Sequence, residues 1–459
     1  MKKSHYAVAV ALSGACFISP ASHAITINVF DKQSEKSVNQ ATVTLNQQST
    51  RVNSQGQAVF TTNDDQATLT VAYTSGNVMR LQTLHNIPVN KDINVYLDNA
   101  HAVTKVAEFS FSVPFGQVPK DVDFSGLLPQ LSYEFAGINA AHFGNISLYE
   151  DQLQDDGKIS LVVVGYNDEK LPHKYGYILD QDPAQLELSS PRLSGPDATP
   201  MTQTAKLLQW KKLADPINVQ SAETPCGFSE PPYNECGMFP PKRGVFSWVN
   251  IKRKGQLYHT PGAFSPARVR GANPTIDLPD STIELAAHDD PLGFFPYNYS
   301  RHSFKRFTSV PDTTIDVKMP NVIIGTINHL GRDSFTVKHD SEAVSIKWQI
   351  NAGNDDLSDV KAIDYGELEL AWFDDKHKQA VVWRHRFPTQ AGSNMIEVTQ
   401  NQLPQNIQFP AADAKFANIQ IWLYGSEGVD GYPAALKLWQ ANEEVMMKGD
   451  SAFKITRWK

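Results

Sequence analysis

The segment Ile25-Thr-Ile-Asn-Val29 alternates apolar and polar side chains, which is the pattern of a β-strand with one buried face. Turn residues such as Asp31 separate it from further short segments of the same kind. These segments lie at 41–45, 58–60, 67–73 and 93–97. Short strands separated by turns predict a β-sandwich over residues 25–98.

The order of strands and turns in this region resembles the carboxypeptidase-regulatory-like family, whose members have a transthyretin-like β-sandwich. The residues that carry the resemblance are Val29, Asp31, Val38, Ala41, Val43, Leu45, Gly56, Ala58 and Phe60. Asn39-Gln40 departs from the family pattern, where a Gly or Pro often precedes the alanine, so an immunoglobulin-like sandwich stays an alternative. The resemblance implies a non-catalytic module attached to an exported protein.

Strand patterns continue from residue 106 to the end of the chain. Residues 107–113 alternate strictly, whereas 161–164 are all apolar, as in a strand buried on both faces. Residues 181–245 are rich in Pro, Ser, Asp and Gln, and strand patterns are weak there. We therefore predict an all-β protein of antiparallel β-sandwiches, with a β-rich middle region at 106–314 and a C-terminal sandwich at 315–459. No clear boundary separates these two regions.

The first 24 residues have the pattern of a secretory signal peptide. Two lysines precede an apolar stretch that is too short to span a bilayer, and Ser22-His23-Ala24 has small residues at the cleavage positions. We expect cleavage after Ala24 and a mature chain in the periplasm or at the cell surface of a Gram-negative bacterium. A lipid anchor at Cys16 is the alternative, although Ser13 stands where a lipoprotein signal has a Leu-like residue.

Cys226 and Cys236 are the two cysteines beyond the signal region, and they lie in a segment rich in Pro and Gly. In an oxidising compartment this arrangement predicts a disulfide, worth roughly 2–3 kcal/mol through loop closure. A zinc site is disfavoured because the segment lacks the second Cys or His pair that zinc needs.

Composition and missing motifs narrow the classes of function. The formal net charge of −8 disfavours nucleic acid as a partner. Beyond the signal, no apolar run reaches transmembrane length. Motifs for nucleophilic catalysis, zinc hydrolysis and phosphate binding are absent from the sequence, so an enzyme is less favoured and no cofactor is implied.

One segment combines residue types that suit a binding site. His288, Asp289 and Asp290 precede a Pro- and Phe-rich stretch that contains Tyr297 and Tyr299. The carboxylates could hold Ca²⁺, and the rings could stack on a sugar. The alternative is a loop whose aromatic side chains fill a gap between domains. Acidic clusters at 354–359 and 151–157 fit a solvated loop and a turn better than a Ca²⁺ site.

Three classes of function remain open, and the sequence does not give the oligomeric state. A non-catalytic envelope protein that binds a protein or glycan partner explains both the sandwich patterns and the missing motifs. A structural component of a surface assembly predicts an exposed apolar strand edge. A carbohydrate-active hydrolase predicts two carboxylates that converge near residues 288–299.

Overall fold

The computed structural model describes most of the chain from residue 23 onward. The described residues are 23–98, 100, 105–112, 118–131, 134–135, 142–149, 153–154, 156–167, 169, 171–183, 209–221, 244–260, 263–266, 270–288, 299–320, 322–324, 336–340, 343–352, 363–374, 376–404, 407, 409–410 and 416–458. Residues 1–22 of the predicted signal peptide, and Cys226 and Cys236 of the predicted disulfide, lie outside them. Strands dominate the described residues, which confirms the all-β fold class.

The N-terminal region forms two facing sheets. One has the order β4-β1-β7, and the other consists of β6, β5, β2 and β3. The strands are β1 (His23–Asp31), β2 (Thr42–Leu45), β3 (Gln48–Arg51), β4 (Gln57–Thr62), β5 (Gln66–Ser75), β6 (Val78–Pro88) and β7 (Ile93–Leu97). Ile25, Ile27 and Val29 alternate with polar residues along β1 and are fully buried in the shared core. All five strands predicted here are present, and β3 and β6 are additional.

The second of these sheets is part of a much longer one. Within the described residues it has thirteen strands, in the order β17-β16-β20-β21-β30-β29-β26-β27-β6-β5-β2-β3, with β18 also paired to β16. The added strands are β16 (Gly244–Arg253), β17 (Gln256–His259), β18 (Ala263–Pro266), β20 (Ser281–His288), β21 (Tyr299–Phe307), β26 (Tyr365–Asp374), β27 (Gln379–Phe387), β29 (Asn418–Ser426) and β30 (Ser451–Trp458). One hydrogen-bonded sheet thus links all three regions proposed from the sequence, whose limits stay predictions.

The remaining described strands form smaller sheets. Strands β23 (Val322–Ile324), β24 (Thr336–His339), β25 (Ala343–Ala352) and β28 (Gly392–Thr399) form one of them. The others contain β8 (Lys105–Ser112), β9 (Asp123–Leu131), β10 (Glu134–Phe135), β11 (His142–Tyr149), β12 (Ile159–Tyr166), β13 (Pro172–Gln181), β14 (Gln209–Lys212), β15 (Ala214–Ser221), β19 (Gly271–Thr275) and β22 (Ile315–Val317). Strand β12 is buried from Ile159 to Gly165, as its apolar run predicts.

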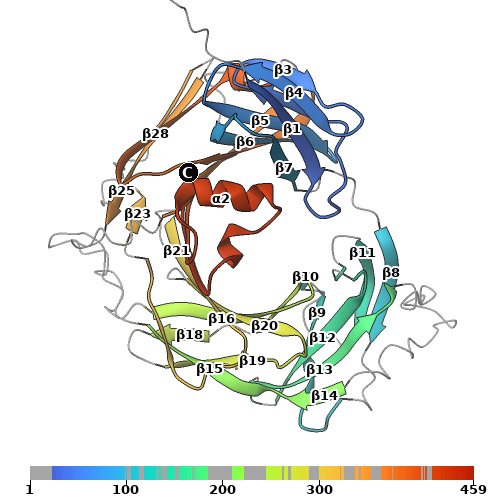
Figure 1. The fold of residues 1–459 in the computed structure, drawn as a ribbon. Helices are drawn as coiled ribbons and strands as arrows, with labels where there is room; N and C mark the ends of the chain where they lie inside the picture. The colour runs from blue at the N-terminus through green and yellow to red at the C-terminus, as the bar shows by residue number, and fades with distance from the viewer. Residues whose placement is uncertain are drawn as a thin grey trace, which may run out of the picture.

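The long sheet bends around helix α2 (Gly431–Gln440), which lies on the inner side of the curve (Figure 1). Tyr432, Ala435 and Leu436 form the buried stripe of this helix, at the spacing of one helical face. The carboxylate of Asp364 fixes the start of the helix, because it accepts hydrogen bonds from the backbone N–H of Gly431 at 3.0 Å and of Ser426 at 2.7 Å. The helix packs on β7 and β26.

The seam between β6 and β27 joins the N-terminal and C-terminal parts of the long sheet. These strands pair in parallel from Ala380 with Val78 to Arg386 with Leu84. On the face buried between the sheets, His85 Nε2 lies 3.1 Å from Nδ1 of the fully buried His385, so one ring donates to the other. The Tyr432 hydroxyl of α2 lies 2.6 Å from the His85 carbonyl and 3.1 Å from the Arg386 carbonyl, which fastens the helix to both strands.

We predict that the seam weakens as the pH falls. Burial lowers the pKa of His85 to about 4 and lowers the pKa of His385 well below its usual value. The unfolded chain takes up protons below about pH 6.5 whereas the folded chain does not, so stability is full above that pH and is lost between about pH 6.5 and 4. At pH 5 the loss from His85 alone is roughly 2 kcal/mol.

Thermal unfolding at pH 7.5 and pH 5 tests this expectation. His85→Gln keeps a hydrogen-bonding group near the Nε2 position without a proton to gain, so its melting temperature should fall less between the two pH values than that of the parent. The control is His173→Gln, because His173 lies at an exposed ion pair. An equal pH response in the parent and in both variants would contradict the role given to the seam.

Candidate functional site

The two faces of the long sheet have opposite character where β26, β27, β29 and β30 lie side by side. Side chains alternate between faces along a strand. On one face Leu368, Leu370 and Ile421 are fully buried in the core shared with the β25 sheet. The opposite face, here called the inner face, carries aromatic and charged side chains. They are Tyr365, Glu367, Glu369, Arg384, Arg386, Trp422, Tyr424 and Lys454.

Three aromatic side chains pack together beside a pocket on the inner face, where Tyr365 is buried and Tyr424 and Trp439 are half-buried. Tyr365 and Tyr424 are cross-strand neighbours, and their rings stack with centroids 4.7 Å apart. Trp439, at the end of α2, meets the Tyr365 ring edge-on at 4.6 Å. Burial raises the pKa of both tyrosines well above the ordinary value, so their hydroxyls stay protonated. The pocket encloses about 290 Å³, and its rim includes Asn94 of β7.

Oppositely charged pairs lie beside these rings. Arg386 Nε donates to Glu367 Oε1 at 2.7 Å, and its guanidinium lies 4.5 Å from the centre of the Trp439 ring. Burial opposes the charge of Arg386, but the neighbouring Glu367 outweighs it, so the arginine pKa is raised. Glu367 also accepts from the Tyr424 hydroxyl at 3.3 Å. Arg386 is therefore held in place from two sides.

A second pocket adjoins the first and encloses about 670 Å³. Arg384 lies between the two, where it donates to Glu369 at 3.0 Å and lies 3.7 Å from Asp98. Lys32, Gln82, Asp98 and Arg384 line both pockets. A single extended ligand could therefore contact both.

This arrangement suits binding better than acid–base catalysis. Glu367 and Glu369 each accept a hydrogen bond from an arginine. Both carboxylates are thus already engaged by an arginine, whereas a general acid must reach the substrate with its carboxyl group. Ring faces next to fixed donors and acceptors are instead what a ligand with both apolar and hydroxyl groups requires.

His288, the first residue of the segment singled out from sequence, lies farther along the inner face. The half-buried ring of His288 on β20 contacts Phe246 at 5.5 Å, Trp248 at 5.4 Å and His302 at 5.6 Å. Asp289, Asp290 and Tyr297 lie outside the described residues, as does the side chain of Tyr299, whose backbone begins β21. The proposed grouping of these five residues thus stays a prediction.

A cross-strand row nevertheless connects His288 to the pocket. The strand registers place Phe246, His288, His302, Lys454, Tyr424 and Tyr365 opposite one another in turn. The row crosses six strands on one face of the sheet. Adjacent strands in a sheet are about 4.8 Å apart. His288 belongs to the same surface as the pocket without lining it.

No metal centre emerges from the part of the chain that the structure describes. In those residues no three His, Cys, Asp or Glu side chains gather as a ligand set. The acidic cluster at 354–359 lies outside them. Of the cluster at 151–157, Asp156 accepts a hydrogen bond from Lys254 at 2.9 Å.

No helix in the described part of the chain is both long and apolar enough to cross a membrane.

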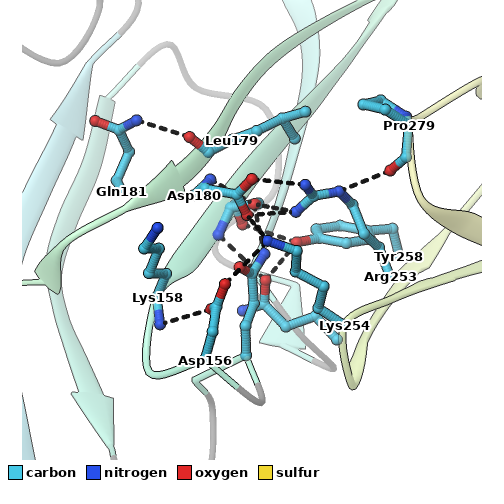
Figure 2. Close-up of polar contacts among 12 residues, drawn as sticks. Asp156, Lys158, Leu179, Asp180, Gln181, Arg253, Lys254, Tyr258 and Pro279 are labelled. Carbon is cyan, nitrogen blue, oxygen red and sulfur yellow. Dashed lines mark hydrogen bonds and ion pairs between the residues drawn. The ribbon is translucent and has the colours of Figure 1, made fainter.

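A second cluster of titratable groups joins β13 to β16 (Figure 2). Both oxygens of Asp180 accept hydrogen bonds from Arg253 at 2.7 Å, and this pairing holds the pKa of the carboxyl far below its usual value. Arg253 also donates to Ser160 at 3.2 Å and to the Pro279 carbonyl at 2.9 Å. Lys254 bridges Asp180 and Asp156. Because these groups bind one another, we assign the cluster to the fold and not to a site.

Comparison with known proteins adds no family assignment. No protein-family model matches the chain, and no curated protein matches it. The resemblance of residues 25–98 to the carboxypeptidase-regulatory-like family therefore stays a prediction.

We predict that Arg253→Met lowers the free energy of unfolding by about 3 kcal/mol, because it removes the buried guanidinium that donates to Asp180, Ser160 and the Pro279 carbonyl. The measurement is thermal unfolding at pH 7. Lys448→Met is the control, since Lys448 pairs with Glu443 at the exposed surface and should cost less than about 1 kcal/mol. Equal melting temperatures for the two variants would rule out the structural role of Arg253.

Proposed function

We propose that this chain is an exported, non-catalytic envelope protein that binds a glycan in the pocket of Tyr365, Tyr424 and Trp439. The single observation that carries the proposal is the set of three aromatic rings beside the Arg386–Glu367 pair. Export is supported by the signal-peptide pattern of residues 1–24.

Sugar rings present C–H groups on one face and hydroxyls at the edge. The half-buried rings of Tyr424 and Trp439, held by the buried Tyr365 between them, offer apolar area to such a face with little loss of side-chain freedom. Fixed charged groups at the rim can donate to and accept from the hydroxyls. Both requirements are met within one pocket that is held by β26, β29 and α2.

The structural-assembly alternative receives less support. It predicts an exposed apolar strand edge, whereas β3, the strand at one end of the long sheet, has the sequence Gln48-Ser-Thr-Arg51 and is exposed at all four positions. Polar and charged side chains on an edge strand oppose sheet-to-sheet association. The hydrolase alternative predicts carboxylates near residues 288–299, where Asp289 and Asp290 lie outside the described residues, so it stays a prediction. Within the pocket, Glu367 and Glu369 are each engaged by an arginine.

The proposal predicts saturable binding to one class of glycan on an array of neutral, amino and acidic oligosaccharides. Trp439→Ala should weaken that binding about tenfold or more, since it removes the wall of the pocket. Phe373→Ala is the matched control, because Phe373 lies exposed farther along β26 and is 56% exposed. Binding is measured by isothermal titration calorimetry of the full chain.

Trp439 also packs on two cores, so the variant is compared with the parent by thermal unfolding first. Tyr424→Phe is a gentler second variant that keeps the ring and removes the hydroxyl bonded to Glu367. If no glycan binds, or if both pocket variants bind as tightly as Phe373→Ala, the proposed function is wrong.

A further inference from the structure

The second pocket is locally cationic although the chain as a whole has a formal charge of −8. Its charged lining residues are Lys32, Arg80, Arg384 and Asp98, so cations outnumber the anion. Tyr73, Gln33 and Gln82 add neutral polar groups. A positive pocket in an acidic protein favours an anionic ligand over a neutral one.

The registers explain why the two arginines face the same space. Arg80 and Gln82 are two apart on β6, so they share a face. In the parallel pairing, Val382 lies opposite Arg80 and Arg384 opposite Gln82. Arg80 and Arg384 therefore lie on one face of adjacent strands, one side-chain repeat apart. The facing sheet covers the neighbouring strand β5, and α2 covers β26, which leaves this space between them.

The cationic side chains of the pocket differ in whether they already pair with an acidic side chain. Arg384 donates to Glu369, and Lys32 lies 3.7 Å from Asp98 and 3.7 Å from Glu444. The guanidinium of Arg80 forms no hydrogen bond or ion pair with the residues that the structure describes, and its Nε is buried without a partner. The Arg80 side chain as a whole is half-buried, so an anion that accepts hydrogen bonds from the accessible end of the guanidinium would supply the partner that it lacks. Arg80 is thus the group best placed to take up an anion.

We propose that the ligand is an acidic glycan whose uronate carboxylate binds Arg80 and Arg384 in the second pocket while a sugar ring lies against the aromatic residues of the first. This inference rests on the proposed function and names its substrate class. The continuity of the pockets through Lys32, Gln82, Asp98 and Arg384 lets one chain of sugars occupy both.

Asp98 favours a uronate over a more highly charged group. Its carboxylate lines both pockets and would repel a dianionic phosphate. The same carboxylate can accept hydrogen bonds from sugar hydroxyls next to a bound monoanion. Planar, two-pronged donation from a guanidinium also matches the geometry of a carboxylate.

The test is isothermal titration calorimetry of the full chain with four probes of similar length. The probes are an oligogalacturonate, the matched neutral galacto-oligosaccharide, a sulfated oligosaccharide and oligoglutamate. We expect the oligogalacturonate to bind at least about tenfold more tightly than the other three, since each lacks either the carboxylate or the ring. Tighter or equal binding of the sulfated or peptide probe would overturn the uronate assignment.

The decisive variants are Arg80→Gln and Arg51→Gln, which change the net charge equally. Arg51 lies exposed on β3, away from both pockets. Arg80→Gln should weaken oligogalacturonate binding about tenfold or more and leave binding of the neutral probe unchanged, whereas Arg51→Gln should change neither. Equal losses in the two variants would indicate non-specific attraction and refute the proposal.

The failure of this inference is distinguishable from failure of the proposed function. Equal binding of neutral and acidic sugars, with loss in Trp439→Ala, would refute the uronate and keep the glycan pocket. Absence of binding to each of the sugars would refute both.

Discussion

The parallel pairing of β6 with β27 is the constraint on which the rest of the structure depends. It connects strands about 300 residues apart in the chain, as the contact between His85 and His385 illustrates. Buried polar contacts hold the two strands together. For example, Trp383 Nε1 donates a hydrogen bond to the Thr83 hydroxyl at 2.7 Å. Buried donors and acceptors that satisfy each other fix one register, because a shift would leave them unpaired. Without this register the two pockets would have no common lining.

The strands themselves follow from sequence, but their partners do not. Alternation predicted the strand that became β1, and the apolar run at 161–164 predicted the buried strand β12. These signals are local, because side-chain periodicity reports which face of a strand is buried. The union of β6 with β27 has no local signal, since it depends on which sheet edges meet after each sandwich has formed. β6 itself was missed, although it is one of the longest strands.

The sequence does contain a charge pattern that indicates the candidate site. Strands β26 and β27 form a hairpin in which β26 carries Glu367 and Glu369 and β27 carries Arg384 and Arg386. Opposite charges at alternate positions of paired strands indicate that one face is polar and ordered by ion pairs. The contact of Trp439 with Tyr365 could not be predicted from local patterns, because the two residues are far apart in the sequence and meet only in the folded chain. His288 was chosen for its aromatic neighbours, and it does lie on the inner face, away from the pocket.

The position of the pockets follows from how the long sheet is covered. The facing sheet of the N-terminal sandwich covers β5 and β2, and α2 covers part of β26, so the inner face is open between them. Side chains in this open part of the face are held by contacts with their neighbours while they stay accessible. Arg386 illustrates this, because Glu367 and the Trp439 ring hold its guanidinium from two sides. Preorganised charges lose little freedom on binding, so they add affinity that mobile surface charges do not. A sheet seam of this kind can therefore act as a recognition surface, while the Arg253 cluster, which satisfies itself, holds the neighbouring sheets together.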